Sequence, residues 1–588
     1  MELIDFAIVI GYFIFIVLAA FGFRRFALDS HHFINGGNAM PWWMAGATAF
    51  MTQFSAWTFT GAAGKAFTDG VAILALFWGN ALGFFIAARF FAARYRKLRV
   101  ETPMDVIAQR FGRPTERLFT WLQFPLSTLT AAIWLNGLAY IISAISGIDI
   151  VPTLLVTGLF ITLISASGGA WAVNATNVIQ LVLILAITLI TGAYALWLAD
   201  GPGPLITHFP GNFWLGSEMP HSSLLLGWVA MVLLQQTVST NNANSCYRFL
   251  VTRNEPDARK AARLAGVLFI VGPVMWFIPP WFSAGQGVDL GSSYPQLGEQ
   301  AINGAYLHFV THMMPAGTLG LALAAMLAAT ISPMSTALNR NAGIFIRNIY
   351  QAPHHSEARL LKAGRWITLL NGFLATLLAW AIAKQDKLGF FELVMAVSSL
   401  IQMPLTIPAL LAVIVRRTPD WAGWSTVLVG TLVSASLYLG FHPTQLPAWL
   451  GGSTLTPREA ADLTFAVTVL AHLVVTCGFF LLTRLWYQPK GYAPQRARQV
   501  ARFFANLKRP LQPSEITLGN PRQTLLLGRL LLLLSFLLSP LVWLATDYLH
   551  GLIVLAVLLA GMGLYLSARR EIRLIRTSAP HKEKRTPD

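Results

Sequence analysis

The sequence predicts an all-α integral membrane protein with about fifteen membrane-spanning helices. Three observations predict this fold class. The 588 residues are 55% hydrophobic and only 11% charged, with a mean hydropathy of +0.58, whereas a soluble domain carries about 25% charged residues. Apolar runs of roughly 20 residues recur along the chain. The basic residues gather in alternate loops between these runs.

The predicted spans follow one another through mostly short loops. They cover residues 3–23, 41–65, 70–93, 117–146, 150–168, 176–199, 223–250, 262–284, 315–348, 364–384, 390–415, 420–441, 462–484, 525–546 and 549–568. Residues 101–113 predict a short amphipathic helix on the cytoplasmic surface, and residues 286–313 form an outer segment with room for a short helix.

Charge orients the spans. The loops 201–222 and 286–313 contain no Lys or Arg, whereas Arg24, Arg25 and the basic run 490–529 lie on the other side of the membrane. The positive-inside rule therefore predicts an outer N-terminus and a cytoplasmic C-terminus. Acidic residues precede the first apolar run, and no cleavage site is clear, so we interpret this run as a span and not as a signal peptide.

Three spans are too polar to face lipid throughout. Span 41–65 carries hydroxyl and amide groups in its middle, span 223–250 ends in LLQQTVSTNNANSCYRF, and span 315–348 contains LAATISPMSTALNRN. Non-helical backbone at membrane depth is tolerated only beside protein or water, where it can bind an ion or a solute. The first and second polar spans each begin a set of five spans, 41–199 and 223–415. This arrangement predicts an inverted repeat with a site between its halves. Ordinary helix packing through small and polar residues is the alternative, and it is strongest for the third span.

The sequence places no acidic side chain in the middle of a span, and this absence indicates the coupling ion. Five acidic residues belong near span ends: Asp69, Asp200, Asp386, Glu392 and Asp462. Lys65 and Arg89 also lie near ends, from which they can reach the interface. A proton-driven carrier usually holds a titratable group within the membrane, whereas carbonyl and hydroxyl oxygens can hold sodium. The sequence therefore favours sodium.

The third polar span can supply such oxygens. Ser332, Ser335 and Thr336 are spaced i, i+3 and i+4, so they share one helical face. Pro333 removes an amide and is expected to kink the helix or free backbone near Ala329. The alternative is that each hydroxyl bonds to its own helix.

Five segments occur in a characteristic order. They are FINGGNAMPWWMAGATAFMTQFSAWTFTGAAG, TPMDVIAQRFG, GGAWAVNATNVIQ, NANSCYRFL and ATISPMSTALNRNAGIFIRNIY. On these segments the chain resembles the sodium:solute symporter family, a branch of the LeuT-type fold, over roughly residues 1–485. The resemblance implies a core of two inverted five-helix repeats with additional N- and C-terminal spans.

This architecture divides the chain into eight parts. They are residues 1–39 (an extra span and a cytoplasmic loop), 40–200 (the first repeat), 201–222 (an outer loop), 223–416 (the second repeat), 417–486 (peripheral spans), 487–524 (a basic cytoplasmic linker), 525–568 (two C-terminal spans) and 569–588 (a basic cytoplasmic tail, expected to be disordered).

The resemblance implies a main sodium site between the first and eighth core spans. Its ligands would be the carbonyls of Met51, Phe54 and Ala329 and the hydroxyl of Ser332. The family places a further hydroxyl at the next position, where this chain has Pro333, so the site is one ligand short.

Some members have a second cation site. Here it would comprise Ser335, Thr336 and Asn177. Asn177 stands where those members have an aspartate, so a second sodium ion is less expected.

The solute site departs from the sugar-carrying branch. That branch has a glutamine at Thr58, a lysine at Phe269 and a gating tyrosine at Ser245, and only Asn242 matches it. Sugar is therefore disfavoured, and tryptophan and amide groups suit a small amino acid, a carboxylate or a similar compact solute. With no buried cation expected, an anionic solute would depend on half-helix N-termini. The candidate solute-binding residues are Gln53, Trp57, Thr58, Asn80, Asn242, Asn244 and Ser245.

The predicted function is sodium-coupled symport of a small organic solute by alternating access, in a bacterial inner membrane. An uncoupled facilitator or a solute sensor on the same fold remains the alternative, motivated by Pro333 and Asn177. The absence of an attached signalling domain argues against the sensor.

An enzyme is not expected, because the spans contain no His/Asp/Glu or Cys/His cluster. Nucleic acid is not an expected partner despite the net charge of +17, because the basic residues are scattered among loops. The solute and the oligomeric state are left open.

Overall fold

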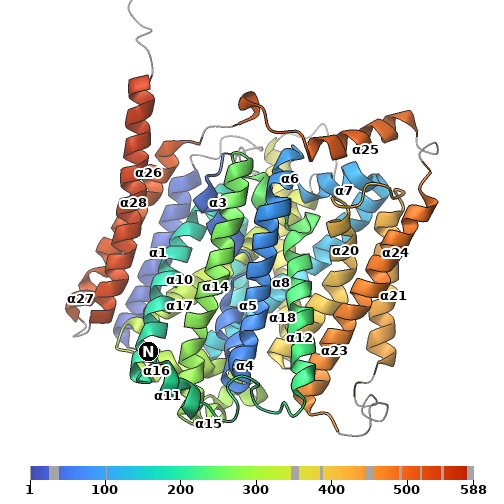
Figure 1. The fold of residues 1–588 in the computed structure, drawn as a ribbon. Coiled ribbons are helices and arrows are strands. Elements are labelled where there is room, and N and C mark those ends of the chain that lie inside the picture. Colours follow the sequence, from blue (N-terminus) through green and yellow to red (C-terminus); the bar gives the residue numbers. More distant parts are fainter. Residues whose placement is uncertain are drawn as a thin grey trace, which may run out of the picture.

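The protein is a bundle of helices that run roughly parallel to one another (Figure 1). The computed structural model describes residues 2–24, 39–100, 102–167, 170–345, 357–384, 389–441, 443, 454–488, 493–516, 519–544 and 548–578. Twelve helices among them are long and apolar enough to cross a membrane, and Leu3–Ala19 and Ile150–Leu163 are shorter apolar helices. The predicted all-α membrane fold is confirmed, while the number of about fifteen spans and the orientation in the membrane stay predictions.

Both predicted sets of five spans are present as helices. The first comprises α3 (Trp42–Met51) with η2 (Ala56–Phe59) and α4 (Gly61–Asp69), α5 (Leu74–Ile86) continuing through η4 (Ala87–Phe91) into α6 (Ala92–Lys97), α8 (Arg113–Ser146), α9 (Ile150–Ser167) and α10 (Ala170–Leu198). The second comprises α12 (Ser222–Asn241) with η5 (Ala243–Ser245) and α13 (Tyr247–Leu250), α14 (Glu255–Gly285), α17 (Thr318–Ile344), α18 (Glu357–Ala383), and α19 (Phe390–Ala396) with η8 (Val397–Gln402) and α20 (Met403–Leu411).

Short helices lie at the two ends of the bundle. The predicted amphipathic helix is α7 (Pro103–Phe111), which begins with a capping box between Thr102 and Asp105. We call the end that carries α7 the inner end, because it is predicted to face the cytoplasm. At the other, outer end lie α11 (Pro202–His208), α15 (Leu290–Ser293), η6 (Pro295–Gly304) and α16 (Ala305–Met313).

The chain after the repeats is more helical than predicted. It contains α21 (Ala422–Gly440), α23 (Pro457–Ala471), η10 (His472–Thr476), α24 (Cys477–Leu482), α25 (Pro494–Asn506), α26 (Pro521–Leu538), α27 (Pro540–Leu544) and α28 (Tyr548–Ser578). The basic linker predicted over 487–524 contains the helix α25, which has apolar residues at helical spacing and buries Phe503. The prediction of a disordered tail from residue 569 is wrong up to Ser578, where α28 ends, and residues 579–588 lie outside the described part.

Helices outside the two repeats support them from the side. The N-terminal helix α1 (Leu3–Arg24) packs against α17 and α10, and the paired helices α26 and α28 pack against α10 (Figure 1). The Asp5 carboxylate accepts a hydrogen bond from the Gly320 backbone N–H at 2.8 Å, in the first turn of α17. Because the first turn of a helix carries unpaired N–H groups, α1 provides an acidic cap for α17.

Candidate ion and solute site

The first polar span breaks in its middle, as predicted. α3 ends at Met51, Ser55 has extended backbone with φ −153° and ψ 178°, and the chain resumes through η2 and α4. The Ser55 hydroxyl accepts a hydrogen bond from the Trp57 N–H at 3.3 Å. Such local side-chain bonds compete with helical ones, which explains why a polar run breaks the helix at this point.

The second polar span breaks at Asn242, which has extended backbone with φ −74° and ψ 164°. The Asn242 amide donates to the Ser239 carbonyl at 2.6 Å, and its side-chain oxygen accepts from the Ser245 N–H at 3.3 Å. The earlier part of the polar run stays helical, where Asn241 donates across to the Gly83 carbonyl at 2.9 Å. The predicted break is therefore confirmed, but it occupies only the end of the polar run.

A polar cluster joins the two broken spans. The Gln53 side-chain oxygen accepts from both terminal nitrogens of Arg248 at 2.7 and 3.2 Å, and its nitrogen donates to Asn80 Oδ1, with the amide orientation assigned from this network. Asn80 Oδ1 also accepts from the Thr240 hydroxyl at 3.4 Å. The structure thus brings together Gln53 and Asn80 of the first repeat with Thr240 and Arg248 of the second.

Arg248 is the member of this cluster that sequence reasoning missed. Only 9% of its surface is exposed, its Nε donates to the Ser245 carbonyl at 2.9 Å, and its guanidinium lies 5.2 Å from the Phe84 ring centre. Within the described part of the chain, no carboxylate forms an ion pair with it. The expectation that no cation is buried is therefore wrong. The sequence alone could have indicated this residue, because an arginine inside the predicted span 223–250 is unusual.

The other solute-site candidates are less closely connected to the cluster. Trp57 stacks on Phe391 of α19 with the ring centres 5.8 Å apart, and Thr58 is 1% exposed. The Ser245 hydroxyl donates to the Ser239 carbonyl at 2.9 Å, next to Asn242. Among the described residues, no hydrogen bond joins Thr58 or Asn244 to Gln53, Asn80 or Arg248.

The first break is also bonded to α17, where the main ion site is expected. The Thr330 hydroxyl accepts from the Ala56 backbone N–H at 3.0 Å, and both residues are fully buried. Pro333 lies inside α17 and has no N–H to donate to the Ala329 carbonyl four residues earlier. The Met51 carbonyl accepts from the Phe54 N–H at 3.3 Å. The expected backbone ligands therefore belong to two elements that are joined at Ala56 and Thr330.

The second expected cation site is only partly described. The Ser335 hydroxyl lies 2.8 Å from the Ser165 hydroxyl of α9, and Asn177 of α10 is 2% exposed. The side chains of Ser332 and Thr336 lie outside the described part of the structure.

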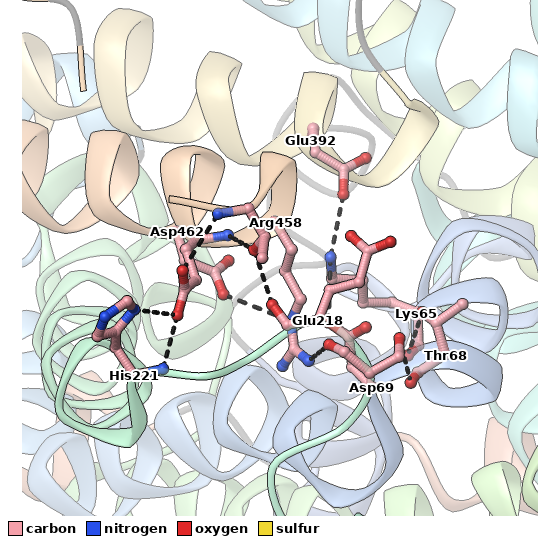
Figure 2. Close-up of polar contacts among 11 residues, drawn as sticks. Lys65, Thr68, Asp69, Glu218, His221, Glu392, Arg458 and Asp462 are labelled. Carbon is pink, nitrogen blue, oxygen red and sulfur yellow. Dashed lines mark hydrogen bonds and ion pairs between the residues drawn. The ribbon is translucent and has the colours of Figure 1, made fainter. Parts of the chain in front are cut away.

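Charged side chains gather at the outer end, in what we call the outer charge cluster: Lys65, Asp69, Glu392, Arg458 and Asp462 (Figure 2). Lys65 Nζ lies 3.1 Å from both Asp69 and Glu392, and Arg458 Nε lies 2.8 Å from Asp69 and 3.7 Å from Asp462. The side chain of Lys65, which was expected to be able to reach the interface, is 12% exposed and ion-paired. The acids do lie near span ends, apart from Asp386, which is outside the described residues. The cluster ties α4 to α19 and α23.

Comparison with known proteins agrees with this geometry. The profile of the sodium:solute symporter family matches residues 33–203 and 218–430, which is more than half of the chain. The chain belongs to the sodium:solute symporter family. This symporter is a multi-pass membrane transporter. It moves sodium and a solute together across the membrane by alternating access.

Relatives of this symporter include carriers named for different solutes. It is 24% identical over 448 residues to the sodium/glucose cotransporter of Vibrio parahaemolyticus. The aligned region covers 70% of this chain and 79% of the relative. It is 25% identical over 474 residues to the sodium/sialic acid symporter NanT of Aliivibrio fischeri, over 75% and 85% of the two chains.

A solved structure of a Na+-coupled sialic acid symporter, in a substrate-bound outward-open state, matches with a TM-score of 0.61 and 19% identity. The match covers 81% of this symporter and 98% of that chain. At this identity the match supports the LeuT-type fold alone.

Proposed function

We propose that this symporter, in a bacterial inner membrane, carries a compact organic solute with a carboxylate group, such as an amino acid. The solute would bind between the two breaks, at Gln53, Asn80, Asn242 and Ser245, with Trp57, Thr58 and Asn244 as outlying wall residues.

The observation that carries this proposal is the Arg248 side chain, which is buried beside Gln53 and has no carboxylate partner among the described residues. A charge at membrane depth is costly and usually functional. An arginine can bind a carboxylate through two parallel hydrogen bonds. A solute carboxylate would therefore supply the missing negative charge, and Gln53 would hold the guanidinium in its absence.

We propose that one sodium ion binds between the first break and α17. Its ligands would be the carbonyls of Met51, Phe54 and Ala329 and the hydroxyl of Ser332. Support comes from the Ala56–Thr330 bond, which joins the two elements, and from Pro333, which leaves the Ala329 carbonyl without its helical donor. A second ion at Ser335, Thr336 and Asn177 is not part of the proposal, because no carboxylate is present among these three residues.

Uptake by the purified protein in proteoliposomes tests both proposals. We expect an inward sodium gradient, but not a potassium gradient, to drive accumulation of a carboxylate-bearing solute. Arg248→Gln should abolish this uptake, whereas Arg89→Gln, at an exposed arginine of η4, should retain it. Accumulation of a neutral sugar that survives Arg248→Gln would contradict the solute assignment. Flux that is independent of the gradient and never concentrates the solute would favour the facilitator.

A further inference from the structure

A segment beyond the family match crosses the inner end of the bundle. It comprises residues 493–516, which form α25 and the short turn η13 (Pro513–Glu515), and we call it the inner strap. Figure 1 shows α25 lying across the ends of the membrane helices, beside α7. The chain then continues to α26 at the opposite edge of the bundle (Figure 1). The inner strap thus passes over the side from which ion and solute are predicted to leave.

The first half of the inner strap is fastened to α7 and to the loop before α21. Arg496 contacts Asp420 through two nitrogens at 2.7 and 3.1 Å, and it donates to the Gln109 carbonyl of α7 at 2.9 Å. Phe503 is fully buried, and the Phe504 ring lies 5.4 Å from the buried guanidinium of Arg110. These contacts combine apolar burial with bidentate ion pairing, so α25 is firmly docked.

α7 lies between α25 and the site, because it also packs against η5, the break of the second polar span. Val106 and Ile107 of α7 are fully buried, and so is Cys246, the residue directly after η5. The order of layers is therefore α25, α7 and then the break that carries Asn242 and Ser245. The break can open toward the inner end only if it separates from α7.

The second half of the inner strap is fastened to α6 and α14, which pack against the broken spans. Arg99, just after α6, contacts Glu515 through two nitrogens at 2.5 and 2.9 Å and donates to the Pro510 carbonyl at 2.9 Å. The Leu511 N–H donates to the carboxylate of Glu255, the first residue of α14, at 2.9 Å. Arg99 has a φ of +58°, which side-chain-bearing residues adopt only at a cost, so these contacts hold it in an unfavourable conformation.

We propose that the inner strap restrains inward opening of the transporter. α14 packs against α3, α5 and α6, and α5 packs against α12, so we treat these helices as one group. α7 and α21 each pack against α8, and we treat these as the second group, which contacts the first at η2 and η5. Alternating access requires one group to rock against the other around the site. The inner strap is bonded to both groups at once, through Glu515 and Leu511 on one side and Arg496 on the other. Inward opening must therefore break one set of these bonds, and weakening either set releases the break.

The native Cys246 reports this opening without any need to know the solute. The chain has two cysteines, so Cys477→Ala leaves Cys246 as the only thiol. The measurement is the rate at which a membrane-permeant maleimide modifies Cys246 in the full-length protein in proteoliposomes. Glu515→Gln and Arg496→Gln should each speed labelling about two- to fivefold, the range expected when a partly exposed ion pair is lost. Arg498→Gln, at an exposed arginine on the same helix, is the matched control and should leave the rate unchanged.

Labelling rates of Glu515→Gln and Arg496→Gln equal to that of Arg498→Gln would overturn the proposal. The two variants cut opposite ends of the inner strap, so poor folding of one leaves the other to decide. The readout requires no transported solute, so its failure is distinct from a failure of the solute assignment. Faster labelling together with unchanged sodium selectivity of uptake would support a restraint that lies outside the binding site.

Discussion

At position 333, one residue changes two ligands of the proposed ion site. Proline has no hydroxyl, so it cannot supply the oxygen that the family resemblance places there. It also has no N–H, so the Ala329 carbonyl inside α17 lacks its usual donor. A carbonyl without that donor is a good ligand for a hard cation. The same substitution therefore removes one oxygen and makes another more available to sodium.

Ser332 and Ser335 offer a direct test at this scale. We expect Ser332→Ala to raise the sodium concentration that gives half-maximal uptake more than Ser335→Ala does, because only Ser332 belongs to the proposed main site. Ser335 instead bonds to Ser165 of α9 at 2.8 Å, so its loss should mainly lower thermal stability. The measurement is sodium-dependent uptake of each variant, with thermal unfolding as the control. Equal or reversed effects on sodium dependence would mean that the ion is placed wrongly.

The residues of the candidate site differ in how well the sequence predicts them. Gln53, Asn80 and Asn242 stand out because polar groups within an apolar span need an explanation. Arg248 was missed although it lies within a predicted span, because arginines near span ends usually reach the interface. Its hydrogen-bond partner Gln53 is distant in sequence and comes from the other repeat. The partners of a side chain cannot be inferred from its own segment.

Among the elements, the two broken spans were predicted and the extent of one break was not. Polar composition alone marks all of 235–246 as unusual, yet the helix continues to Asn241. It continues because neighbouring backbone, such as the Gly83 carbonyl, satisfies the side chains. α25 was missed for a different reason, since its single apolar face is short and lies in a basic, proline-containing stretch. Long apolar elements are predictable, whereas short docked helices depend on tertiary contacts.

The break in the second span should depend on the side chain of Asn242. Asn242→Ala removes both its bond to the Ser245 N–H and its bond to the Ser239 carbonyl. Loss of such a cap costs about 1 kcal/mol, so we expect a lower unfolding temperature and reduced uptake. Asn242→Asp keeps the acceptor and should retain part of the stability. Thermal unfolding of the two variants in detergent checks this expectation, and indistinguishable values would count against a capping role.

At the scale of the whole molecule, the outer charge cluster and the inner strap lie at opposite ends of the same bundle. Lys65 of α4 links the first broken span to Glu392 of α19, whereas Glu515 links α6 to the chain beyond the repeats. Each end thus has polar bonds between elements that must separate at some point in the transport cycle. Opening one end requires its own bonds to break while those at the other end persist.

The pairing at the outer end can be measured as a coupling energy. We expect Lys65→Met and Glu392→Gln to be non-additive in a double-mutant cycle, with a coupling of about 0.5–3 kcal/mol in unfolding free energy. Lys65 pairs with Asp69 as well as with Glu392. Lys65→Met removes both ion pairs and should therefore be the more damaging single change. Additive effects would show that the 3.1 Å contact between Lys65 and Glu392 contributes nothing to stability.

The inner strap should be insensitive to pH in the physiological range. The hydrogen bond from Arg99 lowers the pKa of Glu515 to about 2. A lowered pKa means that this contact stabilises the fold fully above the ordinary glutamate pKa and is lost only as the pH falls toward 2. Maleimide labelling of Cys246, corrected for the fall in the reactive thiolate fraction as the pH falls, should therefore show no further step between pH 8 and pH 5. A step that Glu515→Gln abolishes would contradict this assignment.

The acidic cap that α1 places on α17 has a practical consequence. The Asp5 carboxylate of α1 holds a backbone N–H in the first turn of the helix that is expected to bind sodium. A bulky tag or label attached to α1 near Asp5 would crowd that junction and disturb ion affinity from a distance. Labels for uptake measurements should therefore be attached away from α1.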